Sequence, residues 1–376
     1  MARMFLNEDV LAAARRRVRR LFREFDDVVV SFSGGKDSTV TLHLALEAAA
    51  ELSRPPVKVL WIDQEAEWDC VVRYVRSVMA RPDVEPHWFQ GPFRLFNATA
   101  SGPDPWLHCW QEGREADWIR PKEPGSVHAN ETGEDRFKGL FAAYCRTYFG
   151  DRSVAQLGGV RCEESPGRMN GLTAYATWKD VTWGSMSDRK RGHYVFYPIY
   201  DWCYVDVWKY IHDNGLDYCE LYDWQYRYGV PVRDMRVSNV HHETAVANLR
   251  FLQEVEPETW DRVTARLGAT HAAGRVPEAY RCPAELPFMF GTWREYRDYL
   301  LEELILDGEA RERFRVMFAN WDRTFRVEDP RVDEDVVKLG ISSLLVNDFE
   351  GTKYSTFMVT HARDARAHGV RRGELG

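Results

Sequence analysis

The chain has 376 residues, of which 44% are hydrophobic and 29% are charged, and its formal net charge is −8. These values are ordinary for a globular protein and exclude a disordered chain or a fibrous repeat. The negative balance argues against a broad basic surface, so direct nucleic-acid binding is not favoured. Because one hydrophobic core rarely grows beyond about 250–300 residues, we expect a core domain with an appended one.

The sequence carries no sign of export. Met1–Val10 lacks the apolar run of a signal peptide, and no stretch approaches the ~20 apolar residues of a membrane span. Seven cysteines are scattered without a Cys-x-x-Cys pair or zinc-finger spacing. We therefore expect a cytoplasmic protein with reduced thiols and no membrane partner.

Strands and helices alternate in the first half of the chain. An amphipathic helix is predicted at residues 8–25, within an N-terminal segment 1–25. Predicted strands follow at 27–33, 57–63, 85–90 and 153–158, and predicted helices at 36–53, 66–80, 135–149 and 203–214. This alternation predicts an α/β fold with a doubly wound parallel sheet and helices on both faces. Residues 92–134 break the rhythm with Pro, Gly and Trp, which indicates an insertion that acts as a lid or is a plain surface loop.

The second half is predicted to be mainly helical. Helices are expected at 238–254, 257–267, 292–306, 308–321 and 333–346, with apolar core positions at Trp260, Trp293, Tyr296, Tyr299 and Trp321. This divides the chain into an α/β domain at 1–230, a helical extension at 231–350 and a basic tail at 351–376. His241, His242, Glu243 and His271 are metal candidates, but adjacent histidines diverge on a helix, so solvated or packed side chains are favoured.

A glycine-rich turn joins the first predicted strand to its helix. We name it the 33–38 loop; its residues are Ser33, Gly34, Gly35, Lys36, Asp37 and Ser38. Two glycines here leave backbone N–H groups at the positive end of the helix dipole, which favours phosphate. The serines add hydroxyl donors, Lys36 adds a compact charge, and Asp37 could orient the loop or hold Mg²⁺. The alternative is a plain turn capped by Asp37.

The 33–38 loop resembles the PP-loop of the adenine nucleotide α-hydrolase superfamily, whose members have the HUP type of fold. These proteins cleave ATP to AMP and pyrophosphate, so the resemblance implies ATP and Mg²⁺ as cofactors. Two later segments resemble motifs of phosphoadenosine phosphosulfate reductases and of the small subunit of bacterial ATP sulfurylase. They are the G-x-R-x-E-x-S-x-x-R stretch from Gly159 to Arg168 and the Pro-Ile-x-Asp-Trp run that begins at Pro198. The resemblance covers residues 26–228 and implies a link to sulfur metabolism.

The resemblance also implies the site residues. Besides the 33–38 loop, the expected nucleotide-binding residues are Asp63, Gln64, Glu65, Gly159, Arg161, Ser165 and Arg168. Lys36, Asp37 and Arg161 are expected to be catalytic, and Asp37 is the candidate Mg²⁺ ligand.

Two of these assignments have structural alternatives. Arg161 could bind phosphate bidentately or belong to a surface ion network with Glu163 and Glu164. Asp63 could contact the nucleotide or cap the next helix. Asp201 is expected to cap the helix at 203–214, with Trp202 in the core.

The cysteines bear on the chemistry. A sulfonucleotide reductase of this family needs a nucleophilic cysteine in a Glu-Cys-Gly-Leu-His type motif, and this chain has none. Its last cysteine, Cys282, lies in Tyr-Arg-Cys-Pro. Cys109, Cys145 and Cys162 are a candidate trio for an iron–sulfur cluster, with ordinary buried thiols as the favoured alternative.

Residues 235–350 resemble the helical extension of a reductase-like subgroup that includes the IbrA type of regulator, which is associated with a ParB-like partner. Three functions therefore stay open. The chain could be an ATP pyrophosphatase or adenylyltransferase with an unknown acceptor, a phosphoadenosine phosphosulfate reductase, or a nucleotide sensor that acts on a ParB-like protein. The missing cysteine disfavours the second.

Overall fold

The computed structural model describes residues 7–54, 56–97, 106–241, 249–267, 282–283, 285–305, 308–324, 330–345 and 348. The chain forms two compact units: unit 1 is Met1–Leu95 with His108–Asn239, and unit 2 is Phe96–Leu107 with Val240–Gly376. Residues 231–239, which the sequence analysis placed in the helical extension, thus fold with unit 1.

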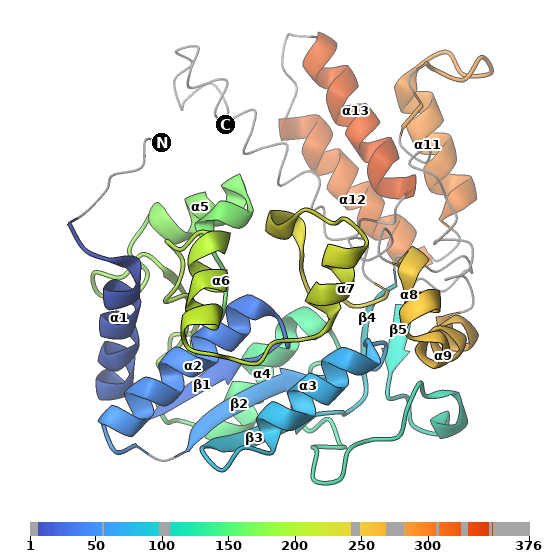
Figure 1. Ribbon diagram of the computed structural model, residues 1–376. Coiled ribbons are helices and arrows are strands. Elements are labelled where there is room, and N and C mark those ends of the chain that lie inside the picture. The colour runs from blue at the N-terminus through green and yellow to red at the C-terminus, as the bar shows by residue number, and fades with distance from the viewer. Residues whose placement is uncertain are drawn as a thin grey trace. The chain divides into compact units, whose positions relative to one another are not determined.

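Unit 1 is built on a six-stranded sheet in the order β3-β2-β1-β6-β8-β7. Figure 1 shows its neighbouring strands β3, β2 and β1. Its strands are β1 (Asp27–Ser31), β2 (Val57–Ile62), β3 (Val84–Phe89), β6 (Val154–Leu157), β7 (Gly184–Asp188) and β8 (His193–Phe196). Val28, Val29 and Val30 of the central strand β1 are buried, as expected for a strand covered on both faces. The predicted α/β sheet is confirmed.

One edge of the sheet departs from the parallel prediction. β7 pairs antiparallel with β8, whereas the other neighbouring strands are parallel. Only residues 189–192 separate the two strands, and such a short turn cannot make the crossover that a parallel pair requires. Gly192 takes a left-handed conformation in this turn, with φ at 68°.

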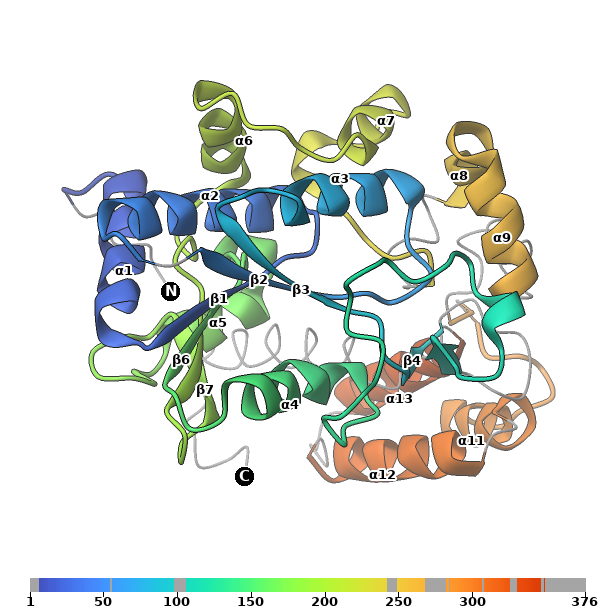
Figure 2. The same cartoon turned by 90° about the horizontal axis from the view of Figure 1, so that it is seen from below.

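Helices cover both faces of the sheet, with α2 and α3 on one face and α4 on the other (Figure 2). The helices of unit 1 are α1 (Val10–Glu24), α2 (Lys36–Glu51), α3 (Asp69–Met79), α4 (Phe137–Phe149), α5 (Pro166–Thr173), α6 (Tyr204–Asp213) and α7 (Leu221–Arg227). Three short 3₁₀ helices are η1 (Glu115–Asp117), η2 (Cys162–Glu164) and η3 (Val232–Asp234). The doubly wound arrangement is therefore confirmed.

Several elements differ from the prediction. The helix expected from residue 66 begins at Asp69, because the chain first makes a tight turn in which Glu65 has a φ of 61°. The strands β4 (Phe93–Phe96) and β5 (Trp106–Cys109) form a two-stranded sheet within the segment expected to be a loop. The sequence analysis did not assign α5, α7, β7 or β8, which are short or weakly patterned.

Asp201 does not cap α6, which corrects another prediction. The N-cap is Cys203, whose backbone N–H donates to Asp206 at 2.7 Å. Asp201 instead accepts two hydrogen bonds from the Arg17 guanidinium, at 2.7 and 2.6 Å. Trp202 is buried as predicted.

From Leu249 onward, the described elements of unit 2 are helices, as predicted. Unit 2 contains α8 (Leu249–Val255), α9 (Pro257–Leu267), α11 (Trp293–Leu304), α12 (Gly308–Thr324) and α13 (Pro330–Leu345). Its core includes Leu301, Phe314, Phe318, Trp321 and Val336. The predicted core position Tyr299 is wrong, because this side chain is 51% exposed. It lies two residues from the buried Arg297, which places it on the opposite face of α11.

The expected helix at 238–254 is wrong at its start, since residues 238–241 are loop and turn. His241 lies in this turn and is buried rather than solvated. Residues 242–248, His271 and the tail 351–376 lie outside the described residues. Within the described ranges, no helix is long and apolar enough to cross a bilayer.

Candidate active site at the 33–38 loop

The 33–38 loop leaves the carboxyl end of β1 at the centre of the sheet. Gly34 has a φ of 73°, a left-handed conformation that glycine adopts without strain. Gly35 is the N-cap of α2 and provides no side-chain hydrogen bond to the helix end. The N-cap residue thus leaves the first turn of α2 without a side chain of its own over the N–H groups, and of these groups the Lys36 N–H donates to the Tyr222 hydroxyl. The positive end of the helix dipole at this turn favours an anion.

The two serines of the loop stabilise its turn. The Ser38 hydroxyl donates to the Gly35 carbonyl at 2.8 Å and accepts the Ser33 N–H at 3.3 Å. The two hydroxyl oxygens lie 3.2 Å apart. Ser33 and Ser38 thus hold the loop in shape.

The second motif lies directly against the first. β6 is the parallel neighbour of β1, so the residues that follow both strands meet at the same edge of the sheet. A β carbon on Gly159 would lie 2.6 Å from the carbonyl carbon of Asp37 and 2.8 Å from the Ser38 nitrogen. Only glycine fits here, which explains why this position lacks a side chain and how the two motifs come together.

Arg161, Asp37 and Lys36 form a chain of charges in which the two cations are buried and Asp37 is partly exposed. The Arg161 Nε donates to Asp37 Oδ1 at 2.5 Å, and its Nη1 donates to Glu163 Oε2 at 2.8 Å. The Lys36 Nζ lies 3.3 Å from Asp37 Oδ2. Arg161 and Lys36 are each only 3% exposed. The alternative network of Arg161 with Glu163 and Glu164 exists, but its arginine is buried and does not lie at the surface.

Lys36 is held by parts of the chain that the sequence analysis did not connect with the site. Its Nζ donates to the Met235 carbonyl at 2.8 Å, and its backbone N–H donates to the Tyr222 hydroxyl at 2.9 Å. The ammonium also lies over the Tyr222 ring, 5.3 Å from its centroid. Burial lowers the pKa of Lys36, an effect that the Asp37 charge opposes.

A pocket of about 410 Å³ opens beside these charges. The residues that line it are Lys36, Asp37, Arg161, Glu163, Glu164, Tyr204, Arg233, Asp234, Met235 and Arg236. Sequence reasoning missed the last five, and of these residues 233–236 match no motif that it used. A cluster of arginine, aspartate and arginine just after a proline was the available signal.

Ser165 and Arg168 lie at the edge of this arrangement. The Ser165 hydroxyl accepts the Arg168 N–H at 3.1 Å and caps α5, a local structural role. The Arg168 side chain pairs with Glu164 and is exposed. Neither residue lines the pocket as it stands.

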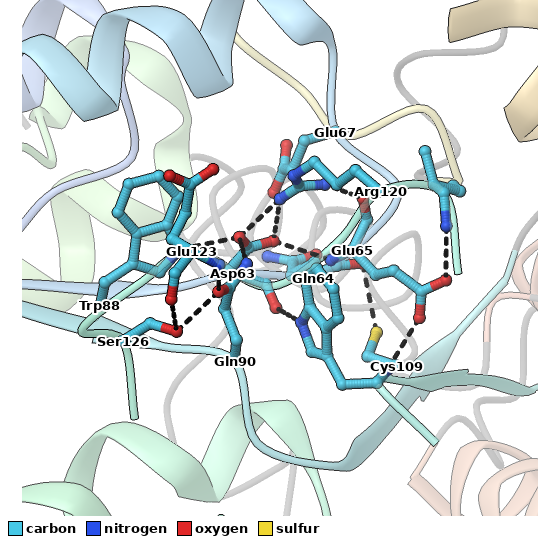
Figure 3. A network of polar contacts seen from close by, with 12 residues as sticks. Asp63, Gln64, Glu65, Glu67, Trp88, Gln90, Cys109, Arg120, Glu123 and Ser126 are labelled. Carbon is cyan, nitrogen blue, oxygen red and sulfur yellow. Dashed lines mark hydrogen bonds and ion pairs between the residues drawn. The ribbon is translucent and has the colours of Figure 1, made fainter. Parts of the chain in front are cut away.

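Asp63 and Glu65 take partners within the protein. Both are fully buried. Asp63 accepts hydrogen bonds from the side chains of Trp88 at 2.8 Å and Gln90 at 2.9 Å, and Arg120 donates to both of its oxygens at 2.5 Å (Figure 3). Asp63 caps no helix, which corrects that alternative.

Glu65 belongs to the same network. Its carboxylate accepts the backbone N–H of Trp110 at 2.7 Å, and its carbonyl accepts a hydrogen bond from Arg120 (Figure 3). These contacts fasten residues 110–120 to the carboxyl end of β2. Of the Asp63, Gln64 and Glu65 set, Gln64 alone is partly exposed, so a nucleotide contact by Asp63 or Glu65 would cost them their present partners.

Replacing Arg120 by alanine is expected to destabilise unit 1 by about 3–5 kcal/mol, because it leaves the charge of Asp63 buried without its cation. Urea unfolding followed by circular dichroism measures this. The matched control is Arg114→Ala, which removes the exposed pair with Asp117 and should cost only ~0–1 kcal/mol. Equal effects of the two changes would contradict the structural role of the Asp63 network.

Glu67 makes the stability of unit 1 depend on pH. Burial, with the nearby Asp63 charge, raises the pKa of Glu67 to about 8. The unfolded chain releases this proton near pH 4.5 and the folded chain only near 8, so this contribution to stability is complete below about pH 4.5 and is lost as the pH rises to 8. We expect the free energy of unfolding to fall across this window. Glu67→Gln, which mimics the protonated group, should flatten the fall; an unchanged slope would contradict it.

The cysteine trio does not form a metal site. Cys109 and Cys145 are buried, and burial raises the pKa of Cys145 to about 12. Across the described residues, no group of three His, Cys, Asp or Glu side chains could hold a metal ion. The alternative of ordinary thiols is therefore the better description.

Comparisons with known proteins match the α/β part and the helical C-terminal part of the chain separately. Residues 27–100 and 119–228 match the model of the phosphoadenosine phosphosulfate reductase domain, and residues 229–357 match a domain of unknown function, DUF3440. The matched part of unit 1 therefore belongs to the phosphoadenosine phosphosulfate reductase family of PP-loop proteins.

Individual relatives extend over different parts of the chain. The uncharacterized protein YbdN of Escherichia coli (strain K12) is 27% identical over 87% of this chain and 83% of its own length. Sulfate adenylyltransferase subunit 2 of Chromobacterium violaceum is 26% identical over 54% of this chain, which spans 62% of that subunit. A crystal structure of phosphoadenylyl-sulfate reductase from Candida auris in complex with phosphate has 15% identity and a TM-score of 0.32, with 60% of this chain and 94% of that one covered.

Proposed function

We propose that unit 1 binds ATP on the 33–38 loop and cleaves it between the α- and β-phosphates, transferring the adenylyl group to an acceptor. The observation that carries this proposal is the set of Lys36, Asp37 and Arg161 at the start of α2, where the N-cap is a glycine, beside a pocket. The similarity to sulfate adenylyltransferase subunits supports ATP as the nucleotide and sulfur metabolism as the setting.

In this proposal, catalysis consists of positioning and charge neutralisation. The N–H groups at the start of α2 and the Lys36 ammonium would hold the polyphosphate, and Arg161 would neutralise negative charge that develops as the α–β bond breaks. Their burial strengthens these interactions, because little water screens them. Asp37 orients both cations through its two oxygens.

Asp37 is also the residue that would hold Mg²⁺. Each carboxylate oxygen has more than one lone pair, so Asp37 can keep its cationic partners and still bind a metal. Mg²⁺ usually takes one or two protein carboxylates and completes its shell with phosphate oxygens and water, which a single aspartate in a nucleotide pocket permits. When bound, the ion would supply further neutralisation of the phosphate charge.

The second candidate function is a reductase that works through a thiol. The match to the reductase domain favours it. The chemistry is less favourable, because burial raises the pKa of Cys282 and so reduces its nucleophilic thiolate form. The third possibility, a nucleotide sensor, would bind ATP without cleaving it. The comparisons point to a subunit partner rather than to a ParB-like protein.

Cys282→Ser is expected to keep most of any measured turnover, since no step of the proposal uses a thiol. Steady-state pyrophosphate release on wild type and variant measures this, with a thermal melt to confirm equal stability. Loss of turnover at equal stability, together with production of sulfite, would favour the reductase.

Mass analysis of acceptors tests the proposal directly. The protein is incubated with ATP, Mg²⁺ and candidate oxyanion or nucleic-acid acceptors, and products are searched for an added adenylyl group. An adenylylated product is expected from the wild-type protein and not from Lys36→Met. Tight ATP binding with no product and no pyrophosphate would favour the sensor.

A further inference from the structure

The carboxylates that line the pocket already have partners. Asp37 contacts Arg161 and Lys36, and Asp234 pairs with Arg233 at 3.3 Å. Glu163 accepts hydrogen bonds from the Arg161 side chain and, at 2.7 Å, from the Tyr204 backbone N–H. Glu164 accepts the Arg161 backbone N–H at 2.7 Å and pairs with Arg168. The negative charge of the pocket wall is thus matched by cations other than Arg236.

Arg236 is different from the other cations of the pocket. Among the described residues, no carboxylate lies within ion-pairing distance of its guanidinium. Its charge acts on Lys36 and on Arg168: the pKa of each is lowered, by burial first and by Arg236 and other charges in addition. Lys36 and Arg236 therefore both line the pocket with Arg168 near them, and among the described residues Arg236 has no carboxylate partner.

The backbone on both sides of Arg236 is fixed. The Met235 carbonyl accepts the Lys36 ammonium at 2.8 Å, and the Arg236 carbonyl accepts the Gln225 side chain at 2.7 Å. Met235 and Gln225 are 3% and 1% exposed. An arginine that starts from such an anchored backbone can extend into the pocket at a small cost in conformational entropy.

We infer that Arg236 is a specificity-determining residue, whose guanidinium binds a terminal tetrahedral oxyanion, phosphate or sulfate, of the ligand seated on the 33–38 loop. The inference rests on the proposed function and deepens it. Arg236 lies in the stretch that matches DUF3440, outside the match to the reductase domain, yet it folds with unit 1. The planar guanidinium suits such an oxyanion because it can donate two parallel hydrogen bonds.

The oxyanion has two sources with the same chemistry. It is either the terminal phosphate of ATP or a separate phosphate or sulfate group of the acceptor. Affinities for nucleotides of different length distinguish them, because AMP has no terminal phosphate beyond the α position.

The test compares wild type, Arg236→Gln and the control Arg227→Gln, which removes an exposed arginine of α7 outside the pocket lining. Calorimetry gives the dissociation constants of ATP and AMP, and of inorganic phosphate and sulfate with AMP present. If Arg236 binds the terminal phosphate, Arg236→Gln weakens ATP about tenfold or more and leaves AMP unchanged. If Arg236 binds a separate oxyanion, the dissociation constants of ATP and AMP do not change. The affinities for inorganic phosphate and sulfate then fall by about tenfold or more.

Other outcomes overturn the inference. If the dissociation constants of all ligands are unchanged in Arg236→Gln, or if Arg227→Gln loses as much affinity, Arg236 has no specific role. The proposed function is not affected by either result. Failure of the wild-type protein to bind ATP, AMP or an inorganic oxyanion removes the proposed function and the inference together. A thermal melt of each variant confirms that the exposed substitutions leave the fold intact.

Discussion

We expect Gly35→Val to abolish ATP binding while the chain stays folded. A β carbon at this position would lie 3.3 Å from the Ser33 hydroxyl and 3.4 Å from the Tyr222 hydroxyl, and valine adds two methyl groups where a phosphate must approach. The backbone of Gly35 is extended, with φ at −82°, so valine can adopt it and α2 can still form. The expected loss of affinity is about 100-fold or more, which corresponds to about 2.7 kcal/mol.

The control is Gly171→Val. Gly171 lies in α5, and a β carbon there meets nothing within 4 Å. Calorimetric titration with ATP and far-ultraviolet circular dichroism on both variants separate loss of the site from loss of the fold. Wild-type affinity in a folded Gly35→Val protein would remove the 33–38 loop from the nucleotide site.

The second large effect concerns Arg161→Lys. Lysine keeps the positive charge, but it cannot contact Asp37 and Glu163 through the two ends of a planar group. If Arg161 neutralises charge in the transition state, kcat should fall about tenfold or more, or at least ~1.4 kcal/mol. Steady-state pyrophosphate release measures kcat.

Arg20→Lys is the matched control, because Arg20 also contacts two carboxylates, those of Glu24 and Asp180, but at the surface. Exposed pairs contribute only ~0–1 kcal/mol, so its turnover should not change. A variant Arg161→Lys with wild-type kcat would show that the buried arginine orders the loop without acting on the reaction.

The sheet and its loop could be predicted from sequence because both depend on local patterns. Buried apolar runs such as Val28–Val30 and the two glycines after them show where a central strand ends and a helix begins. The meeting of Gly159 with the loop then follows from strand order. The antiparallel β7 could not be predicted, because its residues, from Gly184 to Asp188, are largely polar and do not resemble a strand.

The contacts of Lys36 with Tyr222 and Met235 could not be predicted from sequence for a different reason. Tyr222 and Met235 act on Lys36 through a hydroxyl and a backbone carbonyl, across about 200 residues of chain. Every residue has a backbone carbonyl, so the identity of residue 235 does not indicate that its carbonyl binds Lys36. Likewise, the burial of Asp63 depends on Arg120, which comes from a segment without helix or strand periodicity.

The products of ATP test the central claim most directly. The wild-type protein is incubated with ATP labelled at the α-phosphate and Mg²⁺, with and without acceptor, and AMP, ADP, pyrophosphate and inorganic phosphate are quantified. Cleavage between the α- and β-phosphates predicts equal amounts of pyrophosphate and of AMP, free or attached to the acceptor, and neither in Gly35→Val. Formation of ADP and inorganic phosphate by the wild-type protein would contradict the account.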